Sequence, residues 1–172
     1  MTGDNKMNKE PLIKQPMEIP LESGYSYLIK DRNKQLGTKL VSKKDIVGDN
    51  VLYITRNSPD DSENEKSASK NALIWLTYNK GPNCIEPTNI TRLSLRIQEY
   101  LKDHKNATIV FDGLEYLTSQ NDFSTILHFI QLVNDKIMIS DSKLILSLNP
   151  TAFKPNELAQ IEREMEALED TE

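Results

Sequence analysis

The chain alternates between short runs of consecutive apolar residues and longer stretches in which apolar residues recur every three or four positions. The short runs predict strands at residues 24–30, 51–55, 72–77, 108–112 and 143–149. The longer stretches predict helices at residues 34–47, 88–104, 121–138 and 155–168. Because the strands are almost wholly apolar, we expect both faces of the sheet to be buried, as in a parallel sheet covered by helices.

This alternation of strands and helices predicts an α/β fold with right-handed crossover connections. We expect a three-layer α/β/α sandwich with a mostly parallel sheet of about five strands. The polar segment 58–71 is long enough to cross the sheet, but its composition does not predict a stable helix. It is expected to hold either a frayed helix or a disordered loop.

The domain organisation follows from length and local composition. With 172 residues the chain is long enough for one domain with a substantial core. Residues 1–21 are polar and contain three prolines, and we expect a disordered tail or linker there. A single α/β domain is predicted over residues 22–168, followed by a frayed C-terminus at residues 169–172.

Composition excludes several classes of protein. The net charge is −5 and the lysines and arginines are scattered, so nucleic-acid binding is not expected. The single cysteine, Cys84, permits no internal disulfide, and the two histidines lie in no metal-binding motif. We therefore predict no metal and no cofactor. The N-terminus does not resemble a signal peptide and no apolar run is long enough to span a membrane, which indicates a cytoplasmic protein.

Polar residues follow the predicted strands, where ligands bind in open α/β sheets. The candidate ligand or partner site consists of Thr55, Arg56, Asp112, Glu115, Tyr116, Asn121 and Asn149. The structural alternative is that these side chains only satisfy loose backbone groups and cap helices. In that case Arg56 would form an ion pair with Asp112 or Glu115.

Residues 111–123 are expected to form a turn that shapes a partner surface or an internal latch. Asp112 and Tyr116 would connect this turn to Arg56. Asn121 and Asp122 would cap the helix that begins near Phe123.

The sequence argues against nucleotide hydrolysis. A phosphate loop after the first strand needs GxxxxGK[ST], whose backbone amides surround the phosphates. Residues 29–41 contain only Gly37, followed by Thr38 and Lys39 in the reverse order, and Asp31 would repel phosphate. A metal-dependent hydrolase that uses Asp112 and Glu115 therefore remains the least favoured alternative.

Several stretches resemble an archaeal family known as domain of unknown function 835. They are VLYITRNSP (51–59), LIWLT (73–77), FDGLEYLTSQNDF (111–123), LILSLNP (144–150) and ELAQIERE (157–164). The likeness spans residues 24–166. That family is similar to RecA-like and KaiC-like ATPases, but it has lost their phosphate loop. The resemblance implies that Asp112 corresponds to their magnesium-binding acid, and that the protein functions in signalling, because relatives are often joined to signalling modules.

Two classes of function are consistent with these observations. The leading hypothesis is a non-catalytic signalling or protein-interaction domain whose partner is another protein or a second copy of the chain. Leu95 and Phe129, which lie off the main helix faces, are candidates for a dimer contact. The alternative is a sensor that binds a small anion or nucleotide at the carboxyl edge of the sheet without hydrolysing it.

Overall fold

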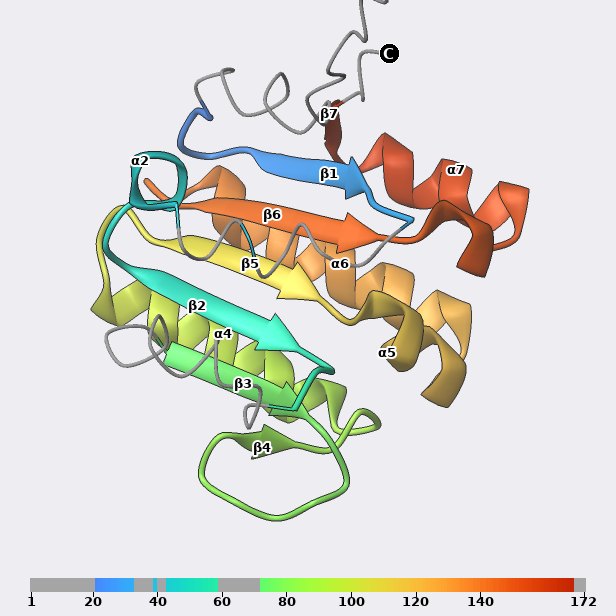
Figure 1. Cartoon of the computed structure of the whole chain (residues 1–172). Coiled ribbons are helices and arrows are strands. Elements are labelled where there is room, and N and C mark those ends of the chain that lie inside the picture. Colours follow the sequence, from blue (N-terminus) through green and yellow to red (C-terminus); the bar gives the residue numbers. More distant parts are fainter. Residues whose placement is uncertain (1–20, 33–38, 40–42, 59–71, 169–172) are drawn as a thin grey trace, which may run out of the picture.

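One parallel sheet forms the centre of the molecule (Figure 1). The computed structural model describes residues 21–32, 39, 43–58 and 72–168. Within these residues the strands are β1 (Ser26–Lys30), β2 (Val51–Thr55), β3 (Ala72–Leu76), β4 (Cys84–Ile85), β5 (Thr108–Asp112), β6 (Lys143–Leu148) and β7 (Glu166–Leu168). Their order across the sheet is β4-β3-β2-β5-β6-β1-β7, and every neighbouring pair is parallel.

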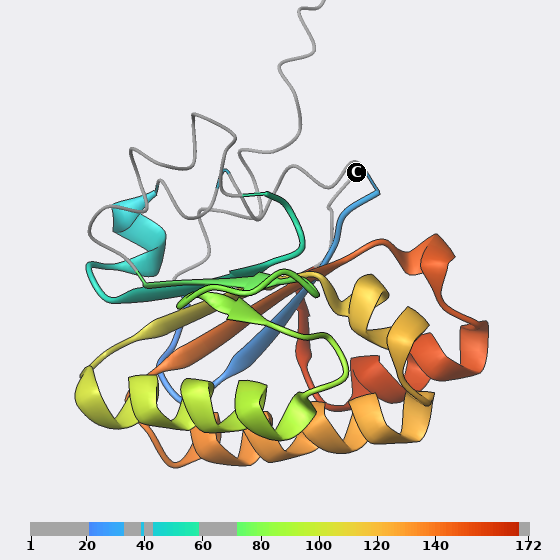
Figure 2. The same ribbon diagram turned by 90° about the horizontal axis from the view of Figure 1, so that it is seen from below.

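Helices lie on both faces of this sheet. One face is covered by α4 (Ile90–Asp103), α5 (Leu114–Gln120), α6 (Phe123–Met138) and α7 (Pro155–Arg163), whereas α2 (Lys44–Val47) lies on the opposite face (Figure 2). A short 3-10 helix, η2 (Pro150–Ala152), connects β6 to α7. The predicted α/β class and parallel sheet are confirmed, with seven strands instead of about five.

Local sequence explains where the main helices begin and what they bury. At the start of α4, the Asn89 side chain accepts a hydrogen bond from the backbone N–H of Arg92, which caps the helix. Leu93 and Ile97, four residues apart, face the sheet and are completely buried. In α6 the same spacing buries the apolar positions Ile126, Phe129, Ile130, Val133 and Ile137.

The core has two parts because successive side chains of a strand point to opposite faces. Leu52 and Ile54 of β2 join the cluster under α4 to α7, while Val51 and Tyr53 join a smaller cluster on the α2 face. All five residues of β2 are buried, as the uniformly apolar run predicts. Each large apolar side chain buried in this way stabilises the fold by roughly 1.5–3 kcal/mol.

The predicted helix over 155–168 is wrong at its C-terminal end. Helix α7 stops at Arg163, and Glu166–Leu168 forms β7, which pairs with β1 at the edge of the sheet. Pairing with β1 and the packing of Leu168 against the α2-face cluster outweigh the helical spacing of Met165 and Leu168. The two-residue strand β4 was also not predicted from the sequence, because so short a run has no period.

Residues 111–123, predicted to be a turn, contain helix α5 instead. Leu114 and Leu117 are fully buried, so tertiary packing stabilises a helix that is too short to be stable alone. Of the predicted helix over 34–47, the structure describes Lys39 and residues 43–47, and the rest lies outside the described residues. So do residues 1–20, 59–71 and 169–172, and the tail, the 58–71 segment and the frayed terminus stay predictions.

Across the described ranges, no helix has both the length and the apolar character that a membrane span requires.

Candidate functional site

Buried polar side chains form a row at the carboxyl edge of the sheet. Thr55 on β2 is level with Asp112 on β5, and Asp112 is level with Ser147 on β6. Neighbouring strands lie about 4.8 Å apart, so the row spans roughly 10 Å. All three residues are buried, and even Asp112, the most exposed of them, is only 9% exposed. Asp31, also buried, follows β1 two residues beyond Ile29, which is level with Ser147.

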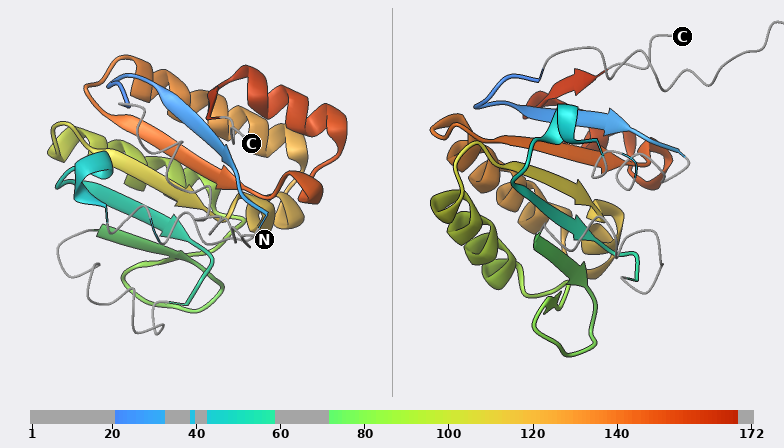
Figure 3. Two further views of the ribbon diagram at one scale, coloured as in Figure 1. Left: turned by 45° about the horizontal axis from the view of Figure 1, so that its top comes forward. Right: turned by 60° about the vertical axis from the view of Figure 1, so that its left-hand side comes forward.

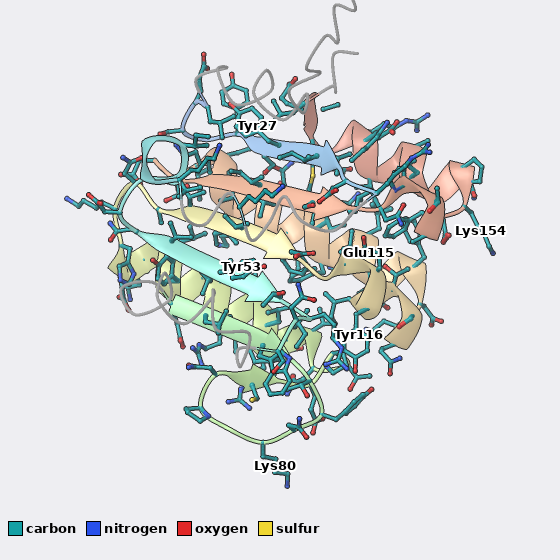
Figure 4. The ribbon with its side chains drawn as sticks, in the orientation of Figure 1. Tyr27, Tyr53, Lys80, Glu115, Tyr116 and Lys154 are labelled. Atoms are coloured by element: carbon teal, nitrogen blue, oxygen red, sulfur yellow. The ribbon has the colours of Figure 1, made fainter. Side chains whose placement is uncertain are left out.

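The row lies on the face of the sheet that carries α2 and not on the face of the four-helix layer, although α2 itself lies at the amino ends of the strands. Phe111 packs in the cluster under α4 to α7, whereas Val110 belongs to the α2-face cluster, and alternation therefore places Asp112 on the α2 side. The Tyr53 hydroxyl, on the same face of β2, donates to Asp112 Oδ2 at 3.3 Å (Figure 4). Sequence reasoning missed Tyr53 and Ser147, although counting every second residue back from the strand ends would have found both.

Arg56 connects three elements at this edge. Its guanidinium donates to the Leu76 carbonyl at 3.1 Å and lies 4.2 Å from the centroid of the Tyr116 ring on α5. Its backbone carbonyl accepts from Trp75 Nε1 at 3.1 Å, and its backbone N–H donates to the Asp112 carbonyl at 3.2 Å. The expected contact with Tyr116 is present, but the guanidinium meets a ring and a carbonyl instead of a carboxylate.

Glu115 joins helix α5 to the end of β6. Its Oε1 accepts a hydrogen bond of 2.6 Å from the backbone N–H of Asn149. Asn149 Oδ1 in turn accepts from the backbone N–H of Thr151 at 3.0 Å and from its hydroxyl at 2.7 Å. Glu115 and Tyr116 both project from α5 beyond the strand ends (Figure 4). Glu115 and Asn149 therefore hold α5, β6 and η2 together.

Asn121 has a different role from the predicted one. Its Nδ2 donates to the carbonyls of Leu117 and Pro87, each at 2.9 Å, so it satisfies the end of α5 and not the start of α6. Asp122 is the N-cap residue of α6, but its side chain makes no capping hydrogen bond. The predicted capping of α6 by these two side chains is therefore wrong.

Close packing at Gly113 leaves no room for a side chain. A Cβ atom there would lie 3.0 Å from Leu76 Cδ1 and 3.3 Å from the backbone nitrogen of Arg56. The backbone φ of Gly113 is +158°, which other residues rarely adopt. The glycine lets the loop after β5 touch the loop after β2, so the polar edge is closely packed.

The described residues contain no group of three or more histidine, cysteine, aspartate or glutamate side chains that could hold a metal ion. Two side chains with a shifted pKa lie at the amino edge of the sheet. Burial raises the pKa of Tyr100 near the end of α4, and burial lowers the pKa of Lys143 at the first position of β6.

Comparison with known proteins places the chain in a family. Residues 30–165 match the family model described as protein of unknown function (DUF835). The chain belongs to this family. Among curated proteins, no sequence matches it.

A solved structure shares the fold. A KaiC-like protein from the hyperthermophilic archaeon Pyrococcus horikoshii OT3 is similar to the DUF835 chain with a TM-score of 0.55 and 14% sequence identity. The likeness covers 76% of this chain and 65% of that one, so the DUF835 chain spans less than two thirds of the longer protein. At this identity the comparison shows the fold alone, and it agrees with the predicted KaiC-like and RecA-like scaffold.

Proposed function

We propose that this DUF835 chain is a non-catalytic protein-interaction domain, serving signalling, on a KaiC-like scaffold. One observation supports this most directly. The polar groups at the carboxyl edge, where related α/β proteins bind ligands, hydrogen-bond to one another and to the backbone of the same edge.

The backbone N–H groups at this edge support the proposal most strongly. An anion site of the nucleotide-binding type needs free backbone N–H groups that point at the phosphates. Here the N–H of Asn149 donates to Glu115, that of Arg56 to the Asp112 carbonyl, and that of Asn57 to Thr55 Oγ1. The Arg56 bond joins β2 to β5, the Asn149 bond joins the end of β6 to α5, and the Asn57 bond closes the loop after β2, so these donors are all used within the fold.

The charge at the edge also disfavours a phosphate site. Asp31 and Asp112 are buried carboxyl-bearing residues close to the strand ends, and negative charge opposes the approach of phosphate. Arg56 is an exposed cation at this edge, and its guanidinium already lies over the Tyr116 ring. This arrangement favours a structural latch over a triphosphate site.

A direct test measures phosphate release from ATP and GTP with magnesium, using the full chain and its Asp112→Asn variant. We expect both proteins to release no more phosphate than a sample without protein. In urea, Asp112→Ala should lower the free energy of unfolding, because it removes the acceptor of the Tyr53 hydrogen bond inside the fold.

Two outcomes would overturn the proposal. Magnesium-dependent phosphate release that disappears in Asp112→Asn would establish an enzyme. A rise in melting temperature with a nucleotide or cyclic dinucleotide that is lost in Arg56→Ala would establish the anion sensor instead.

A further inference from the structure

Large apolar side chains are exposed on the outer surface of the helix layer. Ile139, directly after α6, is 83% exposed, Leu95 on α4 is 53% exposed, and Leu132 on α6 is 43% exposed. Single exposed apolar residues are normal, but a group of three on two adjacent helices is typical of an interaction surface. We call these three residues and the groove beside them the α4–α6 face.

A groove runs between the two helices of this face. Helices α4 and α6 pack side by side under the sheet (Figures 2 and 3). The groove has a volume of about 430 Å³, and Leu95 and Leu101 line it on α4 while Lys136 and Ile139 line it on the α6 side. The face therefore combines protruding apolar side chains with a recess that could receive them.

Three charged side chains line the groove. Glu99 and Lys102 line the groove from α4, and Lys136 lines it from α6. Across the described part of the chain, none of these three side chains takes part in an ion pair. Both signs of charge thus stand free beside one apolar recess, as at the rim of a protein interface.

The face is complementary to itself. A two-fold axis along the groove would place α4 of each copy over α6 of the other, as in an isologous interface. Because α4 and α6 both run toward the amino edge of the sheet, Leu95 of one copy would then meet Leu132 of the second copy and Glu99 would meet Lys136, and the same contacts would form twice. Because each chain has a net charge of −5, the lysines at this face also lower the repulsion between copies.

We propose that the α4–α6 face docks a second copy of this chain to form a two-fold symmetric dimer. The inference rests on the proposed interaction function and names its partner. Of the two residues that the sequence suggested for a dimer contact, Phe129 is buried in the core, so Ile139 takes its place beside Leu95.

Sedimentation velocity of the full chain over a concentration series tests the dimer. We expect reversible dimerisation, and we expect Ile139→Glu and Leu95→Glu each to raise the dimer Kd by more than about tenfold. Tyr78→Ser is the matched control, because Tyr78 is 49% exposed but lies at the carboxyl edge after β3. It should leave the dimer Kd unchanged.

A charge exchange tests the geometry. Glu99→Lys and Lys136→Glu should each raise the dimer Kd by about threefold at low salt, and the double variant should restore it. A monomer at every concentration, or a dimer insensitive to Ile139→Glu and Leu95→Glu, would overturn the inference. Neither result bears on catalysis, which phosphate release decides, so the two proposals can fail separately.

Discussion

The carboxyl edge of the sheet and the α4–α6 face use their side chains in opposite ways. At the carboxyl edge, Glu115, Arg56 and Asn121 are polar, and each contacts a backbone group of the same chain. On the α4–α6 face, Ile139 and Leu95 are apolar and exposed, and the nearby charges have no ion-pair partner within the described residues.

The carboxyl edge and the α4–α6 face should therefore respond differently to substitution. In an open α/β sheet the strand ends are the expected place for a ligand, yet there the chain satisfies its own hydrogen bonds. Unsatisfied surface lies instead on helices far from the strand ends. Substitutions at the edge should therefore change stability, whereas substitutions on the helix face should change association.

The largest effect is expected at Gly113. Gly113→Ala places a Cβ atom 3.0 Å from Leu76 Cδ1 and 3.3 Å from the Arg56 nitrogen, so the two loops must move apart. We expect a loss of about 1–3 kcal/mol in the free energy of unfolding, measured with urea. Gly48→Ala is the control, because Gly48 also has a positive φ but nothing within 4 Å of its Cβ position. Equal losses at both glycines would show that the edge is not closely packed.

A smaller loss is expected at Glu115. Glu115→Ala removes the acceptor of the 2.6 Å hydrogen bond from the Asn149 N–H and leaves that donor in a partly buried position. The free energy of unfolding should fall by about 1–2 kcal/mol, the lower part of the range for a donor left without its acceptor, because the position is only partly buried. Glu115→Gln keeps an acceptor oxygen and should lose less than half of that. If neither variant changes the urea midpoint, the latch between α5 and β6 contributes nothing to stability.

The fold could be predicted from the sequence where an apolar run or a helical period is clear. Strand β5 was predicted with its observed bounds because its apolar run ends at Asp112 and glycine follows. The segments α5 and β7 were not predicted correctly. Leu114 in α5 and Leu168 in β7 receive their packing partners from distant parts of the chain, and local spacing does not report such contacts.

The candidate site was predictable in position but not in role. Parallel strands bring Thr55, Asp112 and Asn149 to one edge, and their places at strand ends can be read from the sequence. Their hydrogen-bond partners cannot be read in the same way. That Glu115 binds the Asn149 amide depends on where α5 begins beside the end of β6, and that Arg56 lies over Tyr116 depends on the register of β2 with β5.

Arg56 should have a modest effect. Arg56→Ala removes a cation that lies 4.2 Å from the Tyr116 ring centroid and a hydrogen bond to the Leu76 carbonyl. Exposed contacts of this kind contribute about 0.5–1 kcal/mol, and we expect a loss of that size in urea unfolding. Arg56→Lys retains the charge but not the planar stacking, and it should recover about half. A loss above about 2 kcal/mol would show that the edge depends on Arg56 more than its exposure indicates.

The smallest effect on stability is expected on the α4–α6 face, and it sharpens the contrast most. Ile139→Ser alters a side chain that is 83% exposed and has no buried contact to lose, so the free energy of unfolding of the monomer should change by less than about 0.5 kcal/mol. Measured at low protein concentration, where the dimer dissociates, this variant and the unaltered chain should unfold at the same urea concentration. At high concentration the unaltered chain alone should gain stability, because association stabilises only the folded state. A clear loss at low concentration would mean that Ile139 supports the fold, and the division between a structural edge and an associating face would then be wrong.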